Sequence, residues 1–235
     1  MEKNDNLFPI RKEILIKVKG KDIAGSMEIP AKAKGLVIFA HGSGSSRFSP
    51  RNKYVAGILN KNNLGTLLFD LLTAEEEKID EYTAEYRFNI QLLAERLEGV
   101  TDWLLKEPSL NGLKLGYFGA STGAAAALIA AAKKSDIIYA VVSRGGRPDL
   151  AMESLPGVKA PTLLIVGGED FEVIELNKTA YENISAKKRL EIIQGATHLF
   201  EEPGALEEVA LITAKWFTVN LQFGIFDTFA LNHRG

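Results

Sequence analysis

Cysteine is absent from this chain of 235 residues. Without it the protein can form no disulfide bond, no thiolate metal site and no cysteine nucleophile. Histidine is scarce, with three copies, so few side chains can act as a base near neutral pH. Any mechanism that requires an imidazole must therefore use His41, His198 or His233.

Long apolar runs and an excess of one charge are also missing. No stretch reaches the ~18 apolar residues that a membrane helix needs, and the polar N-terminus lacks the apolar core of a signal peptide. The 28 basic and 30 acidic residues give a net charge of −2, which does not attract nucleic acid or an anionic membrane. We therefore expect a cytoplasmic protein with no nucleic-acid or membrane partner.

The composition is ordinary for a globular protein, with 46% hydrophobic and 25% charged residues. A chain of this length can bury one large core and shows no linker, so we predict a single domain over residues 1–221. Residues 222–235 contain Phe223, Phe226 and Phe229 without a clear period. We expect a loosely ordered tail there, with a packed tail, an oligomer contact and a non-native extension as alternatives.

Strand-like and helix-like segments alternate along the chain. Apolar or alternating runs predict strands at 13–18, 23–29, 35–40, 65–71, 113–118, 138–143, 162–167 and 189–193. Helices are predicted at 51–60, 85–106, 124–132 and about 204–218. Buried strands that alternate with helices indicate an α/β fold, with a mainly parallel sheet covered on both faces. The first two strands, with a turn at Gly20 and Lys21 between them, form a hairpin that adds an antiparallel N-terminal edge.

Two connecting segments bear on access to a site. Residues 74–86 are rich in acidic residues, and we predict a loop there. Its Glu75–Glu77 run is expected to face solvent, and the alternative is that the loop forms a lid over the site. Residues 144–161 separate two predicted strands and leave room for at most a short helix. This favours an open pocket with little or no cap, suited to small acyl groups.

The motif Gly-Ala-Ser-Thr-Gly at 119–123 follows a predicted strand and precedes a predicted helix. In a G-x-S-x-G turn of this kind the serine is exposed and can act as a nucleophile. Small neighbours fit, because bulky ones would clash with the strand and the helix. The motif alone is equally consistent with a structural turn, so the partners of Ser121 must decide between the two.

A serine hydroxyl becomes a strong nucleophile only when a base takes its proton. His198 lies in a loop after the last predicted strand, where an open α/β sheet presents its functional groups. The neighbours of His41 suggest a role in the backbone of its loop, and His233 lies near the C-terminus. We therefore choose His198 as the base, against the alternative of a non-catalytic histidine.

An acid must orient that base. Asp170 follows the predicted strand 162–167 and completes the chain order serine, aspartate, histidine that an α/β-hydrolase shows. The alternative is that Asp170, or its neighbour Glu169, only forms the turn. Asp70 and Asp149 are reserve candidates, since both lie at or after predicted strands.

An oxyanion formed on the substrate needs two N–H donors. Thr122 supplies one from its backbone, and Ser43 supplies the second from the glycine-rich loop after strand 35–40, with Gly42 as the fallback. A phosphate cradle is the rival interpretation of this loop. It is disfavoured because the loop lacks the third glycine of a dinucleotide fingerprint, and no P-loop motif occurs in the chain.

Three further residues are candidates for contact with a substrate: His41, Gly42 and Arg144. Arg144 directly follows the predicted strand 138–143 and could bind a substrate carboxylate. We favour instead an ion pair between Arg144 and Asp149 or another acid of that loop.

Four motifs, taken in order, resemble those of the α/β-hydrolase superfamily, in its dienelactone-hydrolase-like group. They occupy residues 39–44, 119–123, 164–170 and 195–198. The similarity extends over about residues 11–218, which is nearly the whole predicted domain.

The resemblance implies an α/β-hydrolase fold, a triad of Ser121, Asp170 and His198, and hydrolysis of an ester or a related acyl bond. Dienelactone hydrolases proper use a cysteine nucleophile, which this chain lacks. The resemblance therefore favours a serine esterase, with dienelactone itself in doubt as the substrate.

We predict a carboxylesterase-like serine hydrolase that cleaves small, soluble esters through an acyl-enzyme. It needs no metal or organic cofactor, its partner is the small-molecule ester, and we expect a monomer or homodimer. Lactone opening, thioester cleavage and acyl transfer are alternatives on the same triad. A non-catalytic ligand-binding protein of this fold is the alternative from another class. A dehalogenase or epoxide hydrolase would carry an aspartate in place of Ser121.

Overall fold

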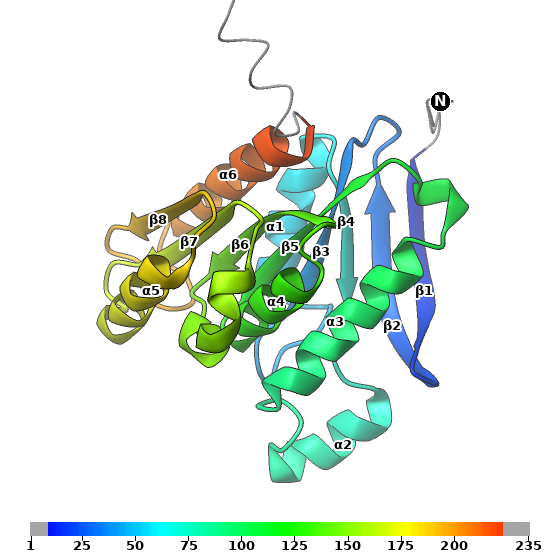
Figure 1. The fold of residues 1–235 in the computed structure, drawn as a ribbon, viewed down its shortest axis with the longest axis horizontal. Helices are drawn as coiled ribbons and strands as arrows, with labels where there is room; N and C mark the ends of the chain where they lie inside the picture. Colours follow the sequence, from blue (N-terminus) through cyan, green and yellow to red (C-terminus); the bar gives the residue numbers. More distant parts are fainter. Residues whose placement is uncertain (1–8, 223–235) are drawn as a thin grey trace, which may run out of the picture.

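The computed structural model describes residues 9–222, which fold around an eight-stranded sheet (Figure 1). The strand order is β1-β2-β4-β3-β5-β6-β7-β8. The strands are β1 (Ile10–Val18), β2 (Lys21–Ile29), β3 (Gly35–Ala40), β4 (Gly65–Phe69), β5 (Lys114–Ala120), β6 (Ile138–Arg144), β7 (Thr162–Gly167) and β8 (Lys188–Ile193). Strand β2 pairs antiparallel with β1 on one side and with β4 on the other. Strands β3 to β8 all run parallel to one another. The predicted α/β fold with an antiparallel N-terminal edge is confirmed.

The N-terminal hairpin has a two-residue turn at Lys19 and Gly20. Both residues have positive φ, at 48° and 80°, as the turn that matches the twist of paired strands requires. Val18 then faces Lys21 and Ile16 faces Ile23 across the ladder. The predicted hairpin is therefore correct, with its turn centred one residue earlier.

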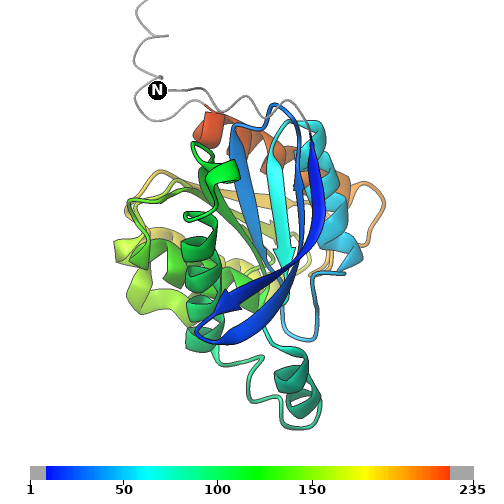
Figure 2. The same ribbon diagram turned by 90° about the vertical axis from the view of Figure 1, so that its right-hand side faces the viewer.

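Helices cover both faces of the sheet (Figures 1 and 2). One face carries α3 (Ile90–Leu104), α4 (Thr122–Lys133), the 3₁₀ segment η2 (Pro148–Gly157) and α5 (Phe171–Asn183). The other face carries α1 (Pro50–Lys61) and α6 (Ala205–Phe217). Every residue of β3, β4 and β7 is buried, which explains why these strands are continuous apolar runs in the sequence.

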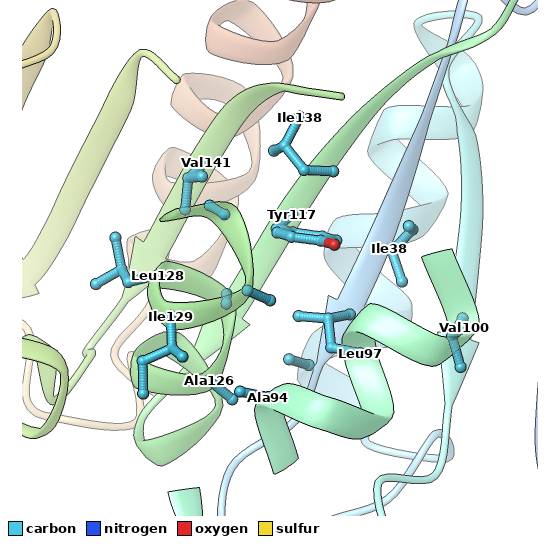
Figure 3. Close-up of a cluster of buried hydrophobic side chains, with 14 of the residues drawn as sticks. Ile38, Ala94, Leu97, Val100, Tyr117, Ala126, Leu128, Ile129, Ile138 and Val141 are labelled. Atoms are coloured by element: carbon cyan, nitrogen blue, oxygen red, sulfur yellow. The ribbon is translucent and has the colours of Figure 1, made fainter. Parts of the chain in front are cut away.

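The larger core fills the space between the sheet and helices α3 and α4 (Figure 3). Tyr117 projects from β5 into this core, and Leu97 lies beside it on α3. The Tyr117 hydroxyl is satisfied by Thr101 at 2.6 Å, while burial raises the pKa of that phenol. Residues 124–127 of α4 are all alanine and fully buried, so this helix packs closely on the strand that precedes it.

The predicted loop at 74–86 is wrong, because it contains helix α2 (Ala74–Thr83). Thr73 caps the helix by accepting a hydrogen bond from the Glu76 amide, and the Glu76 carboxylate accepts one from the Thr73 amide. This capping box is the T-x-x-E pattern of the sequence, and acids favour the first turn of a helix. Glu76 is moreover buried against Arg96 at 2.6 Å, so only part of the acidic run faces solvent.

Helix α3 begins later than predicted, at Ile90 with Asn89 as its cap. The carboxylate of Asp80 in α2 accepts hydrogen bonds from the Tyr86 and Arg87 amides at 2.7 and 3.0 Å. These bonds hold the chain in a turn where the apolar spacing alone suggested a continuous helix. A short 3₁₀ segment, η1 (Pro108–Leu110), follows α3.

The connection 144–161 contains only η2, as the prediction of at most a short helix requires. The described chain ends with the π-helical turn η3 (Thr218–Gln222). Of the predicted tail 222–235, only Gln222 lies within the described residues. Between residues 9 and 222, no helix combines the length and the apolar character needed to cross a bilayer.

Candidate active site

Ser121 occupies the sharp turn between β5 and α4. Its φ of 51° and ψ of −123° lie in a region of backbone conformation that residues other than glycine rarely adopt. Gly119 permits this turn, because a Cβ there would lie 2.7 Å from the Ala124 amide nitrogen. A Cβ on Gly123 would overlap the carbonyl oxygens of Ala40 and His41. The small residues of the motif are therefore needed for close backbone packing.

Hydrogen bonds from neighbouring segments hold the strained turn. The Ser121 amide donates to the Arg144 carbonyl at the end of β6, at 3.1 Å. The Ser121 carbonyl accepts from the amides of Ala124 and Arg147, each at 3.1 Å. The position of the serine is thus tied to the end of β6, to the loop that follows β6 and to α4.

His198 and Asp170 are in direct contact. The distance between His198 Nδ1 and Asp170 Oδ2 is 2.6 Å. Asp170 follows β7 and occupies the position just before α5. A hydrogen bond from the Glu169 amide to the Ala196 carbonyl joins the loop of Asp170 to the loop of His198. The Asp170 side chain is 15% exposed and that of His198 is 38% exposed, so the acid is shielded and the imidazole is accessible.

Gly145 lies where the turn that holds Ser121 approaches the loop that holds His198. It follows Arg144, whose carbonyl binds the Ser121 amide, and a Cβ on Gly145 would lie 3.5 Å from His198 Cε1. Ser121 and His198 form no hydrogen bond in this structure. Nε2 is the ring nitrogen of His198 that has no partner among residues 9–222. Such bonds are often made only when substrate is bound.

The two reserve acids are engaged elsewhere. Asp70 accepts hydrogen bonds from the backbone and the guanidinium of Arg47. Asp149 is held by two bonds from Arg147, at 2.9 and 2.8 Å. Neither is placed against the imidazole, so the geometry supports Asp170 as the orienting acid.

The loop after β3 lies directly against Ser121. A Cβ on Gly42 would approach the Ser121 Cβ to 3.0 Å. The Ser43 amide, expected to bind an oxyanion, donates to the Thr122 hydroxyl at 3.0 Å. An oxyanion would replace or share that bond. The Thr122 amide is at the first position of α4 and has no acceptor within the helix.

His41 is buried, and both of its ring nitrogens form hydrogen bonds with the backbone of the loop and its neighbour. Its Nε2 accepts a hydrogen bond from the Leu71 amide at 3.1 Å, so this nitrogen carries no proton. The other nitrogen, Nδ1, then donates to the Gly42 carbonyl at 3.0 Å. Burial lowers the pKa of His41, which keeps the ring neutral. The neutral ring joins the loop to the end of β4, in line with the backbone role suggested by the sequence.

The favoured ion pair between Arg144 and Asp149 is wrong, because Asp149 binds Arg147. Arg144 is buried on the α1 side of the sheet, with its guanidinium 5.8 Å from the Phe200 ring centre. Among residues 9–222, its side chain has one polar contact, a 3.4 Å hydrogen bond to Asn52, and no carboxylate forms a salt bridge with it. Burial, and then the charge of nearby Arg51, lower the pKa of Arg144 to about 10.

Substituting Arg144 by methionine should therefore stabilise the protein by about 1–3 kcal/mol, because it removes a buried charge that lacks an anionic partner. The free energy of unfolding in urea measures this. Arg147→Met is the matched control, since Arg147 is half-exposed and paired, and it should cost at most about 1 kcal/mol. If Arg144→Met destabilises the fold, the guanidinium makes favourable interactions that outweigh its burial.

A pocket of about 260 Å³ opens beside the loop after β3, residues 41–46, which we call the oxyanion loop because it holds the expected second oxyanion donor. It is lined by residues 41–46, by members of the segment from Asp70 through α2 to Arg87, and by Leu93; we refer to it as the α2 pocket. Ser121 and His198 do not line it, but Gly42 does, and a Cβ on Gly42 would lie 3.0 Å from the Ser121 Cβ. Sequence reasoning missed Asp80 and Arg87 because it placed no helix here; the T-x-x-E pattern is the signal that finds it. Within the described part of the chain, no group of three metal-ligating side chains occurs.

Comparison with known proteins decides the family. The model of the dienelactone hydrolase family matches residues 61–223. This chain belongs to that family. The resemblance noted in the sequence is thereby confirmed.

A similar solved structure agrees with the family, whereas the curated relatives carry another name. A dienelactone hydrolase from Anabaena variabilis is 56% identical, with a TM-score of 0.89, over 91% of this chain and 99% of that one. Est1E from Butyrivibrio proteoclasticus shares the fold at 16% identity, with a TM-score of 0.76 over 89% of this chain and 99% of its own. Two curated Mycobacterium tuberculosis proteins are 54% identical over 91% of this chain and carry the provisional name phosphoribosyl transferase. This dienelactone hydrolase family member spans 47% of their length, about half.

Proposed function

We propose that this family member is a serine hydrolase that cleaves small carboxylic esters through an acyl-enzyme. One observation carries the proposal: the 2.6 Å contact between His198 and Asp170 lies at the same edge of the sheet as the strained Ser121. Nucleophile, base and orienting acid are the groups that this chemistry requires. The provisional transferase name belongs to proteins of about twice this length and is not transferred to this chain.

In the proposed reaction, Ser121 Oγ attacks the ester carbonyl carbon while its proton passes to His198 Nε2. The Thr122 amide and the loop amides of Ser43 or Gly42 bind the oxyanion. The bond to the alcohol then breaks, and His198 gives its proton to the leaving oxygen. Water attacks the acyl-enzyme, transfers a proton through His198 back to Ser121, and releases the carboxylic acid. Asp170 keeps the imidazole in the correct tautomer throughout.

The absence of a large insertion between β6 and β7 supports small substrates. Only η2 occupies this connection, so the edge of the sheet near Ser121 has no helical cap from it. Lactone opening, thioester cleavage and acyl transfer would use the same three residues. The acyl-enzyme is common to all of them, and its formation is therefore the primary test.

We expect a fluorophosphonate probe to label the protein once, on Ser121, and p-nitrophenyl acetate to give a burst of p-nitrophenol equal to the enzyme concentration. Mass spectrometry of the digested adduct locates the label, and stopped-flow absorbance records the burst. Prior labelling should abolish turnover. A protein that neither reacts with the probe nor releases p-nitrophenol would instead be a ligand-binding member of the fold.

A further inference from the structure

The outer wall of the α2 pocket is built from residues that the proposed chemistry does not use. Helix α2 stands beyond the end of the sheet toward which the parallel strands point (Figures 1 and 2). Gly42 and Ser43 line the pocket as well, and Gly42 lies so near Ser121 that a Cβ on it would be 3.0 Å from the Ser121 Cβ. A substrate group in this pocket would therefore be adjacent to the reacting carbonyl.

Asp80 fixes the guanidinium of Arg87 at this wall. Asp80 is 2% exposed, and its carboxylate accepts hydrogen bonds from Arg87 Nε and from the Tyr86 and Arg87 amides. Arg87 Nη2 donates to the Asp80 carbonyl at 2.6 Å. The third nitrogen, Nη1, has no partner among residues 9–222 and lies 3.9 Å from the position of a Cβ on Gly44. A fixed donor thus remains unused at the oxyanion loop.

The charges around this donor oppose an anionic ligand. Asp80 neutralises Arg87, and Arg47 neutralises Asp70. Glu77 and Glu81, one turn apart on α2, also line the pocket and form no salt bridge within the described chain. The pocket therefore presents N–H donors in a field that is negative overall, which favours a neutral oxygen over a carboxylate.

We propose that Arg87 determines substrate specificity by donating a hydrogen bond from Nη1 to a neutral ether, hydroxyl or carbonyl oxygen of the ester, and that the α2 pocket disfavours carboxylates. The substrate class is thus neutral, oxygen-bearing esters or lactones. This rests on the proposed hydrolase function. Asp80 is a positioning residue, since it acts through Arg87.

Pairs of substrates of equal size test the hydrogen bond. On the acyl side, p-nitrophenyl methoxyacetate is compared with p-nitrophenyl butyrate; on the alcohol side, 2-methoxyethyl acetate is compared with butyl acetate. We expect Arg87→Met to lower the ether-to-alkyl ratio of kcat/KM by about tenfold in one of the two series, the effect of one hydrogen bond to a charged donor. Within one variant, the ether-to-alkyl ratio of kcat/KM does not depend on the fraction of protein that is folded. Comparing this ratio between the variant and wild type also removes the difference in intrinsic reactivity between the two esters.

Two controls complete this comparison. Arg11→Met removes the same charge at an exposed arginine paired with Glu28, away from the α2 pocket, and should change neither rate. If Arg87→Met does not fold, Arg87→Gln replaces it, because glutamine keeps one amide donor for Asp80. The ether-to-alkyl ratio should fall by the same factor in Arg87→Gln. Wild type should cleave p-nitrophenyl hemisuccinate, which carries a carboxylate, more slowly than p-nitrophenyl butyrate.

The outcomes separate this proposal from the proposed function. If wild type cleaves the alkyl esters but the ratio is unchanged in both series, the role of Arg87 is wrong and the hydrolase stands. Faster cleavage of the hemisuccinate than of the butyrate would overturn the exclusion of carboxylates. If wild type cleaves no ester and resists the fluorophosphonate probe, the hydrolase function fails and the role of Arg87 with it.

Discussion

Ser121→Ala is expected to lower kcat for p-nitrophenyl acetate by about 10⁵–10⁶-fold, because the Oγ atom that forms the acyl-enzyme is gone. The fold should be unaffected, within about 0.5 kcal/mol, since alanine keeps the Cβ and the Ser121 hydroxyl caps no helix. Steady-state kinetics and urea unfolding on the same preparation measure both quantities.

Ser121→Gly separates chemistry from backbone strain. Glycine adopts a φ of 51° without the cost that serine incurs, so this variant should be as inactive as Ser121→Ala but more stable by about 1 kcal/mol. Ser135→Ala, between α4 and β6, is the serine control and should retain full activity. Activity in Ser121→Ala above about 1% of wild type would place the nucleophile elsewhere.

Gly123→Ala is expected to destabilise the protein by about 3 kcal/mol or more, and to reduce activity as well. The new Cβ would overlap two carbonyl oxygens at the end of β3 and lie 2.7 Å from the Ala40 carbonyl carbon. These are backbone atoms that cannot rotate aside, so α4 must move away from the sheet. Such a shift also displaces the Thr122 amide from the oxyanion loop. The midpoint of urea unfolding measures the first effect.

The same substitution at Gly57 should have the opposite sign. Gly57 lies inside α1, and a Cβ there would have no atom within 4 Å. Alanine should stabilise this helix by about 0.5–1 kcal/mol, because it restricts the unfolded chain and favours the helix. For Gly123→Ala, the contradicting result is a stability equal to that of wild type. It would show that α4 can move away from β3 at no cost in free energy.

Local patterns predicted most of the fold. The strands that are buried on both faces, such as β3 and β7, are continuous apolar runs, and their limits agree with the prediction. The segment 74–90 could not be read in this way. Its helix α2 is amphipathic only weakly, and the buried Glu76 and Asp80 pair with arginines from later in the chain. A pattern of apolar residues does not detect helices that pack through ion pairs.

The sequence likewise did not predict which charged residues form ion pairs. Arg144 and Arg147 are three residues apart, and either could reach Asp149 by distance along the chain. The alternation of a strand directs Arg144 to the α1 side of the sheet, whereas Arg147 lies in the loop beyond it with Asp149. The position within the strand, rather than the spacing, selects the partner.

The sequence by itself determined that the chain has an α/β fold, that cysteine chemistry is excluded, and that Ser121, Asp170 and His198 follow one another in loops after strands. These conclusions depend on local chemistry and on the order of residues. Only the tertiary structure decided which side chains meet: the 2.6 Å contact between His198 and Asp170, the Thr122 hydroxyl bound to the Ser43 amide, and the Arg87 donor at Gly44. Each joins segments far apart in the chain, and their approach depends on the register of the sheet and on the packing of α2, which no local pattern encodes.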